Sequence, residues 1–209
     1  MLFHSEETYL NWFDELAEQE FLIIDNFIDT TLYNKLFSFL QKKKEADVLK
    51  KAGIGALSDF TIDKKIRGDF VFWLDRQRDE ELGEFYALID ELIYGLRRFC
   101  YLPIQDFEFH LAHYPIGTFY KAHVDSFQNR SNRIISFVLY LNPDWKEGDG
   151  GELVIHKDGK TLSFPPVKGR LALFKSDTVL HEVAITNTDR YSLTGWLLNN
   201  PVGVGFLGN

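Results

Sequence analysis

The sequence predicts an α+β protein in which helices from the N-terminal half pack on antiparallel sheets from the C-terminal half. Two stretches of the first hundred residues, 32–40 and 82–96, carry apolar side chains at helical spacing. From about residue 106 the pattern changes to short apolar segments separated by turn residues. Many short strands with turns between them are typical of a double-sheet jelly roll or a barrel, and amphipathic helices need such a sheet to pack on.

Three helices and one short strand are expected before residue 100. The expected ranges are 5–18, 30–44 and 80–99 for the helices and 21–25 for the strand. Ser5 is the candidate N-cap of the first helix, and Asp29 or Thr30 that of the second. The helical period predicts that the first helix buries Leu10, Phe13, Leu16 and Ala17.

The second half is expected to hold strands joined by tight turns. They are placed at 107–114, 119–125, 133–141, 151–156, 170–175, 180–185 and 190–198. Asp158-Gly159 predicts a hairpin turn because both residues tolerate positive φ. Pro165-Pro166 confines its segment to an edge or a connection, since proline cannot donate to a ladder. Residues 46–68 lack a regular period, and so long a connection is typical of a mobile cover over a site.

Composition narrows the classes of function. The formal net charge of −8 argues against a nucleic-acid binder or a protein attached to acidic membranes. The single cysteine, Cys100, excludes an intramolecular disulfide and is expected to act as a small buried apolar residue. No signal-peptide pattern and no stretch of about 18 apolar residues is present, so we expect a cytoplasmic protein.

The most informative residues are His123, Asp125 and His181. On an extended strand, residues two apart point to the same face, so His123 and Asp125 can offer an imidazole and a carboxylate to one ion. A His-x-Asp pair alone is a weak signal, and the fold must bring His181 to it. Two histidines and one carboxylate on one face of an octahedron leave positions open, which is the ligand set of non-haem Fe(II) oxygenases.

Arg190 could supply a fixed cationic fork for a dicarboxylate such as 2-oxoglutarate. The stretch 181–196 is interpreted as a strand, a polar turn and a second strand that begins near Arg190, which places this arginine one hairpin away from His181. Tyr140 could add a phenolic hydrogen bond, and Thr194 faces the same way as Arg190 on one strand. For Tyr140 and Thr194, core packing with a satisfied hydroxyl is the equal alternative.

Residues 114–196 resemble the catalytic core of the prolyl hydroxylase branch of the 2-oxoglutarate/Fe(II)-dependent dioxygenases, in particular the hypoxia-sensing prolyl hydroxylases and their bacterial relatives. The matching strings are HYP (113–115), YKAHVD (120–125), Arg133 with FVLYLNPDW (137–145), GGELVI (150–155), HEV and RYSLTGW (181–196), and upstream IRGDFVFW (66–73). The resemblance implies a single domain, 1–209. A double-stranded β-helix (jelly roll) core would cover 106–199, and residues 1–105 would supply packing helices and a substrate loop.

The resemblance also implies roles for individual residues. Iron would be held by His123, Asp125 and His181. Arg190 would bind the distal carboxylate of the cosubstrate 2-oxoglutarate, with Tyr140 hydrogen-bonding it, Thr194 close by and Tyr114 near the iron end.

On the substrate side, the resemblance implies that Tyr120 and Trp196 border the entry for the target residue. Arg67 and Asp69 would form an exposed ion pair that shapes the substrate loop, with Arg133 nearby. Residues 46–68 differ most from the animal enzymes, so the resemblance does not carry over the animal substrate.

The implied reaction is 4-hydroxylation of a prolyl residue in a protein, coupled to conversion of 2-oxoglutarate and O2 to succinate and CO2, with ascorbate as the reductant. The protein partner would present a proline and could be a translation component. Three alternatives stay open. The same chemistry could act on a small molecule or a non-prolyl side chain. The jelly roll could be a non-catalytic binding module. A zinc hydrolase could use the same triad, although Arg190 and Tyr140 would then lack a role.

Overall fold

The computed structural model describes residues 3–52, 67–126 and 132–200. The helices are α1 (Glu6–Gln19), α2 (Thr30–Glu45) and α3 (Gly83–Phe99), the last preceded by the 3-10 turn η1 (Glu80–Leu82). The strands are β1 (Phe21–Ile24), β2 (Lys50–Lys51), β3 (Phe70–Trp73), β4 (Asp106–Tyr114), β5 (Tyr120–His123), β6 (Arg133–Tyr140), β7 (Leu153–Lys157), β8 (Lys160–Phe164), β9 (Leu171–Lys175), β10 (Leu180–Val183) and β11 (Arg190–Leu198).

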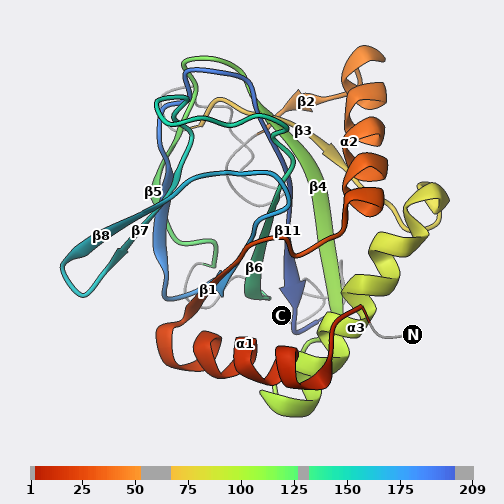
Figure 1. The fold of residues 1–209 in the computed structure, drawn as a ribbon, viewed down its shortest axis with the longest axis vertical. Coiled ribbons are helices and arrows are strands. Elements are labelled where there is room, and N and C mark those ends of the chain that lie inside the picture. Colours follow the sequence, from red (N-terminus) through yellow and green to blue (C-terminus); the bar gives the residue numbers. More distant parts are fainter. Residues whose placement is uncertain (1–2, 53–66, 127–131, 201–209) are drawn as a thin grey trace, which may run out of the picture.

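The described strands form two antiparallel sheets. The larger sheet has the order β1-β9-β6-β11-β4-β3-β2, and the smaller has the order β5-β10-β7-β8. Helices α2 and α3 cover the side of the larger sheet that faces away from the smaller one, and α1 lies across one end (Figure 1). Two antiparallel sheets with helices from the N-terminal half on one side confirm the predicted α+β jelly roll.

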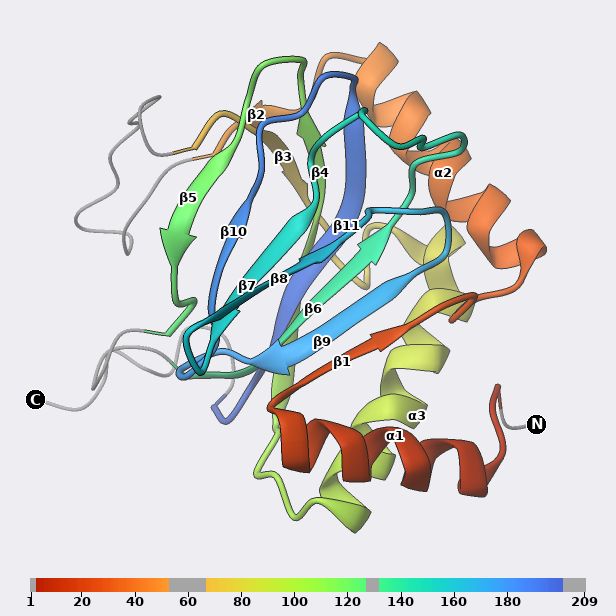
Figure 2. The same cartoon turned by 60° about the vertical axis from the view of Figure 1, so that its left-hand side comes forward.

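The larger sheet uses its two faces differently. On β11, Leu193 and Leu197 belong to the apolar core under the helices. Arg190, Thr194 and Trp196 alternate with them and line a pocket between the sheets. This division follows from the pleat, because successive side chains of a strand point to opposite faces. Figure 2 shows both sheets face-on, with the smaller one in front.

Both N-cap predictions are confirmed. The Ser5 hydroxyl accepts a hydrogen bond from the backbone N–H of Thr8 at 3.1 Å. The Asp29 carboxylate accepts one from the N–H of Leu32 at 2.8 Å. Each bond satisfies an N–H that has no partner inside its helix, so these two residues define where α1 and α2 begin.

The predicted buried face of α1 is only half right. Phe13 and Leu16 are buried, but Leu10 and Ala17 are exposed, and Tyr9 is buried instead. The reason is tertiary, because α1 packs against α3. A Cβ at Gly95 of α3 would lie 2.8 Å from the Phe13 ring. The absence of a side chain at Gly95 therefore leaves room for this ring to pack against α3. That contact centres the buried face on positions 9, 13 and 16 and turns position 10 outward.

The turn predictions between strands have mixed outcomes. The Asp158-Gly159 hairpin joins β7 to β8, with φ of 51° and 71° at the two turn residues. The following segment lies at a sheet edge, as the two prolines predict. The predicted hairpin between His181 and Arg190 is wrong. Strand β10 belongs to the smaller sheet and β11 to the larger one, so the connection crosses from sheet to sheet.

Cys100 is half-buried, since it caps the C-terminus of α3 at the rim of the core. Of the connection predicted as a mobile cover at 46–68, residues 53–66 lie outside the described residues, and the flanking Lys50–Lys51 pair with β3. In the described ranges, no helix has the length and apolar character needed to cross a membrane.

Candidate active site

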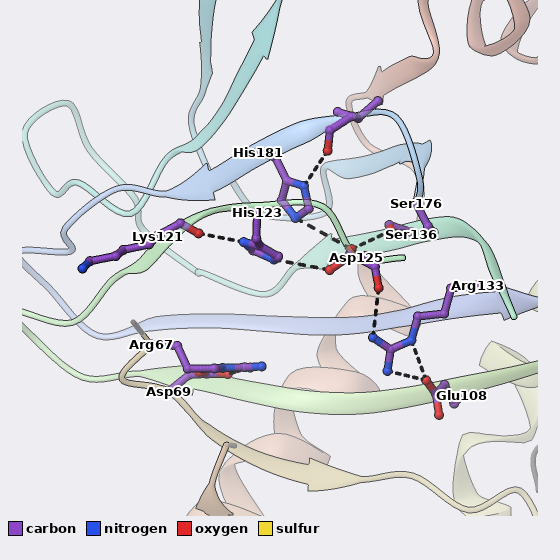
Figure 3. Close-up of polar contacts among 11 residues, drawn as sticks. Arg67, Asp69, Glu108, Lys121, His123, Asp125, Arg133, Ser136, Ser176 and His181 are labelled. Carbon is purple, nitrogen blue, oxygen red and sulfur yellow. Dashed lines mark hydrogen bonds and ion pairs between the residues drawn. The ribbon is translucent and has the colours of Figure 1, made fainter. Parts of the chain in front are cut away.

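Three side chains converge between the sheets from one end of the neighbouring strands β5 and β10 of the smaller sheet. His123 ends β5 and lies opposite His181 of β10 in the strand register. Asp125 follows in the bend after β5, so the strand predicted to reach it is shorter than expected. The His123 Nε2 lies 3.3 Å from one carboxylate oxygen of Asp125 and the His181 Nε2 lies 3.7 Å from the other (Figure 3). One ligand atom from each residue lies within 4.8 Å of the others, which suits a single ion.

Backbone carbonyls set the tautomer of both imidazoles. The His123 Nδ1 lies 2.7 Å from the carbonyl oxygen of Lys121, and the His181 Nδ1 lies 3.0 Å from that of Val179 (Figure 3). A carbonyl only accepts, so each Nδ1 carries the proton and donates it. Each Nε2 therefore points to the Asp125 carboxylate, and in the tautomer with the proton on Nδ1 it offers its lone pair to a metal, as a metal-ligating histidine requires. Burial lowers the pKa of His181, which keeps this imidazole neutral for ligation.

Asp125 is held in its ionised form. Burial alone would raise its pKa, but His181, His123 and the Ser136 hydroxyl together lower it below the usual range. The Ser136 hydroxyl donates to the second carboxylate oxygen at 2.6 Å and lies 2.9 Å from the Ser176 hydroxyl. We did not single out these serines from the sequence. The signal was a serine at position 136 in the apolar run from Ile134 to Leu139.

Arg190 is a buried cation without a carboxylate partner in the part of the chain that the structure describes. Its side chain is 3% exposed, and its Nε donates to the Gly151 carbonyl at 2.7 Å. No carboxylate of the described residues lies within ion-pairing distance of its guanidinium. The rings of Tyr114 and Tyr140 flank it, at 4.9 and 5.1 Å from Cζ. A buried guanidinium is costly unless a charge partner arrives, so the pocket suits a carboxylate ligand.

Tyr140 and Thr194 lie where the sequence predicted. The Tyr140 hydroxyl is fully buried beside the Arg190 guanidinium, which can only donate to it, so its own O–H has no acceptor among the described residues. Burial raises the pKa of Tyr140, so it remains a neutral donor. Thr194 lines the pocket with Arg190, and its hydroxyl lies 3.0 Å from that of Ser192. An unpartnered donor beside an unpaired cation fits the distal carboxylate of a 2-oxo dicarboxylic acid.

Tyr120 contacts both the candidate iron ligand His123 and Arg67. Its ring stacks on His123, with 3.6 Å between centroids, and the Arg67 guanidinium lies 4.5 Å above its other face. Arg67 in turn forms a bidentate pair with Asp69, at 2.7 and 2.5 Å (Figure 3). The exposed pair expected from the sequence is wrong. Asp69 is buried and only 12% of the Arg67 side chain is exposed. The pair is therefore part of the pocket edge and not of an exposed loop surface.

Trp196 and Arg133 form the opposite side of the pocket. The Arg133 guanidinium lies 3.4 Å from the centroid of the Trp196 ring. Two nitrogens of Arg133 donate to one oxygen of Glu108, at 3.0 and 2.7 Å (Figure 3). Glu108 was not predicted, because nothing in the sequence marks it as the partner of a residue 25 positions away.

The predicted site residues thus meet in one place. The pocket between the sheets is lined by Arg67, Tyr114, Tyr120, His123, Asp125, His181, Arg190, Thr194 and Trp196, with Asp69, Arg133 and Tyr140 directly behind them. The donor set fits Fe(II) and the unpaired arginine fits 2-oxoglutarate. When bound, iron would supply the activation of dioxygen, while the protein orients the cosubstrate and excludes water. This combination is that of a non-haem iron oxygenase that uses a 2-oxo acid.

Comparisons with known proteins agree with this class. Residues 109–198 match the family model of the 2OG-Fe(II) oxygenase superfamily. The solved prolyl-4-hydroxylase of Pseudomonas putida is 32% identical with a TM-score of 0.83, over 92% of this chain and 100% of that one. A prolyl hydroxylase of Trichoplax adhaerens, solved with a peptide fragment of the hypoxia inducible factor oxygen degradation domain, is 27% identical with a TM-score of 0.83, over 93% and 90% of the two chains.

A curated PKHD-type hydroxylase of Parvibaculum lavamentivorans is 34% identical over 89 residues. The match covers 42% of this chain and 40% of that relative, so the chain spans about two-fifths of its length. The full-length match to the Pseudomonas enzyme and the family model together show that the chain belongs to the 2OG-Fe(II) oxygenase superfamily, a family of dioxygenases.

Gly151 offers a specific test of how Arg190 is held. Its φ is 74°, and an added Cβ would lie 2.8 Å from the Arg190 Cδ. We expect Gly151→Ala to displace this side chain and to raise the apparent KM for 2-oxoglutarate about tenfold, which corresponds to about 1.4 kcal/mol of lost binding. Gly159→Ala is the matched control, since Gly159 has φ of 71° but open space around it. Equal effects of the two variants on this KM would contradict the contact with Arg190.

His110, on the pocket wall, should make the metal-free protein sensitive to acid. Burial and the nearby Arg67 lower its pKa from 6.5 to about 3. Between about pH 6.5 and 3, His110 therefore binds a proton in the unfolded chain but not in the folded chain. The free energy of unfolding falls as the pH drops through this range. Between pH 7 and 5 this residue should account for about 2 kcal/mol of lost unfolding free energy. Urea unfolding at both pH values measures this difference. The unfolding free energy of His110→Gln should fall between pH 7 and 5 by about 2 kcal/mol less than that of the wild type. Equal falls in the two proteins would contradict the prediction.

Proposed function

We propose that this chain is a 2-oxoglutarate- and Fe(II)-dependent prolyl hydroxylase that acts on a proline in a protein or peptide. His123, Asp125 and His181 would hold the iron. Arg190 and the Tyr140 hydroxyl would bind the distal carboxylate of 2-oxoglutarate, with Thr194 beside them.

The observation that carries the cosubstrate assignment is the buried guanidinium of Arg190 without a carboxylate partner in the described chain. A bound dicarboxylate would neutralise it in a low-dielectric setting, where charge-assisted hydrogen bonds are strong. The iron ligands lie in the same pocket. One end of the cosubstrate can therefore reach Arg190 while its 2-oxo acid end faces the metal cluster, with Tyr114 along its side.

The prolyl target is supported by the aromatic mouth of the pocket. Tyr120 and Trp196 line it, and Trp73, 47% exposed, lies 6.3 Å from the Trp196 ring. A prolyl ring is apolar and has no N–H, so aromatic faces can hold it without leaving a donor unpaired. The similarity of the chain along its length to two prolyl hydroxylases supports the same target.

The first experiment measures succinate formed from 2-oxoglutarate with Fe(II) and ascorbate. Host extract would be divided by ultrafiltration into a protein fraction and a small-molecule fraction, and Asp125→Ala would serve as the inactive control. Stimulation by the protein fraction, followed by detection of a proline that has gained one oxygen atom, is the expected result. Stimulation by the small-molecule fraction alone would instead favour a metabolite substrate.

We propose a translation component as the partner class, on the family resemblance of residues 114–196 alone, and mass spectrometry of the protein fraction tests it directly. A cytoplasmic location suits a site that must keep iron ferrous, and ascorbate in the assay would take over that role.

A further inference from the structure

His110 is the one pocket-lining imidazole to which the metal and cosubstrate sites give no task. It lies on β4, opposite Thr194 of β11 and Trp73 of β3 in the strand register. Its ring contacts two indoles, 4.8 Å from Trp73 and 5.5 Å from Trp196, which are 6.3 Å from each other. Thr194 belongs to the cosubstrate side and Trp73 to the open mouth, so His110 lies between the cosubstrate and the entering substrate.

The two nitrogens of His110 have different surroundings. Nδ1 is fully enclosed and has no hydrogen-bond partner among the described residues. Nε2 has none there either, but unlike Nδ1 it is not among the fully enclosed atoms, and the residue, 3% exposed, lines the pocket. An enclosed bare acceptor is tolerated better than an enclosed N–H without a partner. The favoured tautomer therefore has its proton on Nε2, where it faces the pocket.

This N–H is a neutral donor. Burial and the nearby Arg67 lower the pKa of His110, so the ring carries no charge at neutral pH. The indole N–H of Trp196, on the neighbouring strand, is enclosed in the same way as His110 Nδ1, so Nε2 of His110 is the donor available to a ligand. A neutral donor suits a neutral acceptor, such as an amide carbonyl oxygen. It adds less for a carboxylate, whose charge it cannot neutralise.

We propose that His110 donates a hydrogen bond from Nε2 to a backbone carbonyl oxygen of the substrate, next to the residue that is hydroxylated. His110 then selects a peptide, and not a free amino acid, at the mouth of the pocket. This inference rests on the proposed function, because it names the part of the peptide substrate that the site recognises beyond the target ring. The substrate would also relieve an orphaned polar group on the pocket wall.

A set of matched variants tests which nitrogen acts. The amide nitrogen of glutamine can reach the place of Nε2, whereas that of asparagine reaches only the place of Nδ1, and methionine offers no donor. The probe is the capped peptide Ac-Gly-Pro-Gly-NH2. In two analogues, one of the two carbonyls that flank the prolyl ring becomes a thiocarbonyl, which has a similar shape and no charge but is a weaker acceptor. Binding is measured by NMR titration of the full chain loaded with Mg(II) and 2-oxoglutarate.

In the wild type, one thiocarbonyl peptide should bind about fivefold more weakly than the parent peptide, as expected for one lost hydrogen bond. In His110→Met and His110→Asn the same two peptides should bind equally, and in His110→Gln the difference should return. A double-mutant cycle of this kind isolates the pairwise contact. Equal discrimination between the peptides in the wild type and His110→Met would overturn the proposal.

A second readout does not need a substrate. The 15N resonances of His110 should be those of a bare Nδ1 and a protonated Nε2, and the opposite tautomer would overturn the subsite for any substrate. Failure of all three peptides to bind would overturn the peptide subsite. Titration of 2-oxoglutarate into the same Mg(II)-loaded samples separates that result from a failure of the dioxygenase assignment, because it reports on the Arg190 side of the pocket alone.

Discussion

Replacing Asp125 with alanine is expected to abolish iron-dependent turnover and to weaken metal binding by about 100-fold or more, since losing even an outer partner of a metal site costs about 10- to 100-fold. Asp125 is the only anion of the three-residue cluster, and both of its oxygens face a bare Nε2. Without it, two neutral imidazoles would have to hold a divalent ion. Mn(II) titration with thermal unfolding measures the effect, because a metal that binds only the folded state raises its stability.

The fold of Asp125→Ala should remain intact. The substitution removes a buried carboxylate together with the dehydration cost that it carries, and it leaves only the Ser136 hydroxyl without its acceptor. Asp177→Ala is the matched control, because Asp177 is exposed and lies three residues before β10. A variant that still gains stability with Mn(II) as the wild type does would show that the metal is held elsewhere.

Replacing Arg190 with methionine is expected to weaken 2-oxoglutarate binding by roughly 2–5 kcal/mol, which is about 30-fold or more in affinity. The buried guanidinium is the single cation that both faces the cosubstrate side of the pocket and lacks a carboxylate partner in the described chain. Methionine fills a similar volume, so the packing against Tyr114 and Tyr140 is largely kept. The loss should appear in the apparent KM for 2-oxoglutarate and in the stabilisation that 2-oxoglutarate confers.

Arg190→Lys separates charge from geometry. Lysine keeps the charge but not the planar fork, so its KM for 2-oxoglutarate should lie between those of the wild type and the methionine variant. Metal affinity serves as the internal control, because the described contacts of Arg190 are with Gly151, Tyr114 and Tyr140 and not with the three ligand residues. Mn(II) binding should therefore be retained in both variants. An unchanged requirement for 2-oxoglutarate in Arg190→Met would mean that the cosubstrate pocket is misplaced.

The helix starts and the hairpin turn could be predicted from short patterns of neighbouring residues. Ser5 and Asp29 could be recognised as N-caps because a short oxygen-bearing side chain before an apolar period is a local pattern, and the described contacts confirm both. The Asp-Gly turn between β7 and β8 was equally local. The face of α1 could not be predicted, because Tyr9 rather than Leu10 is buried only through the position of α3 and the space that Gly95 leaves.

The sequence alone determined which chemical groups this protein has and in which order, including the ligand-type residues His123, Asp125 and His181 and the arginine that follows them. Residue type and strand period act over a few positions and can be recognised without a fold. Only the tertiary structure decided that β10 and β11 belong to different sheets, that the Arg67–Asp69 pair is buried, and that Ser136, Glu108 and His110 join the site. These facts depend on contacts between strands far apart in the chain, and burial and pairing of that kind leave no local pattern in the sequence.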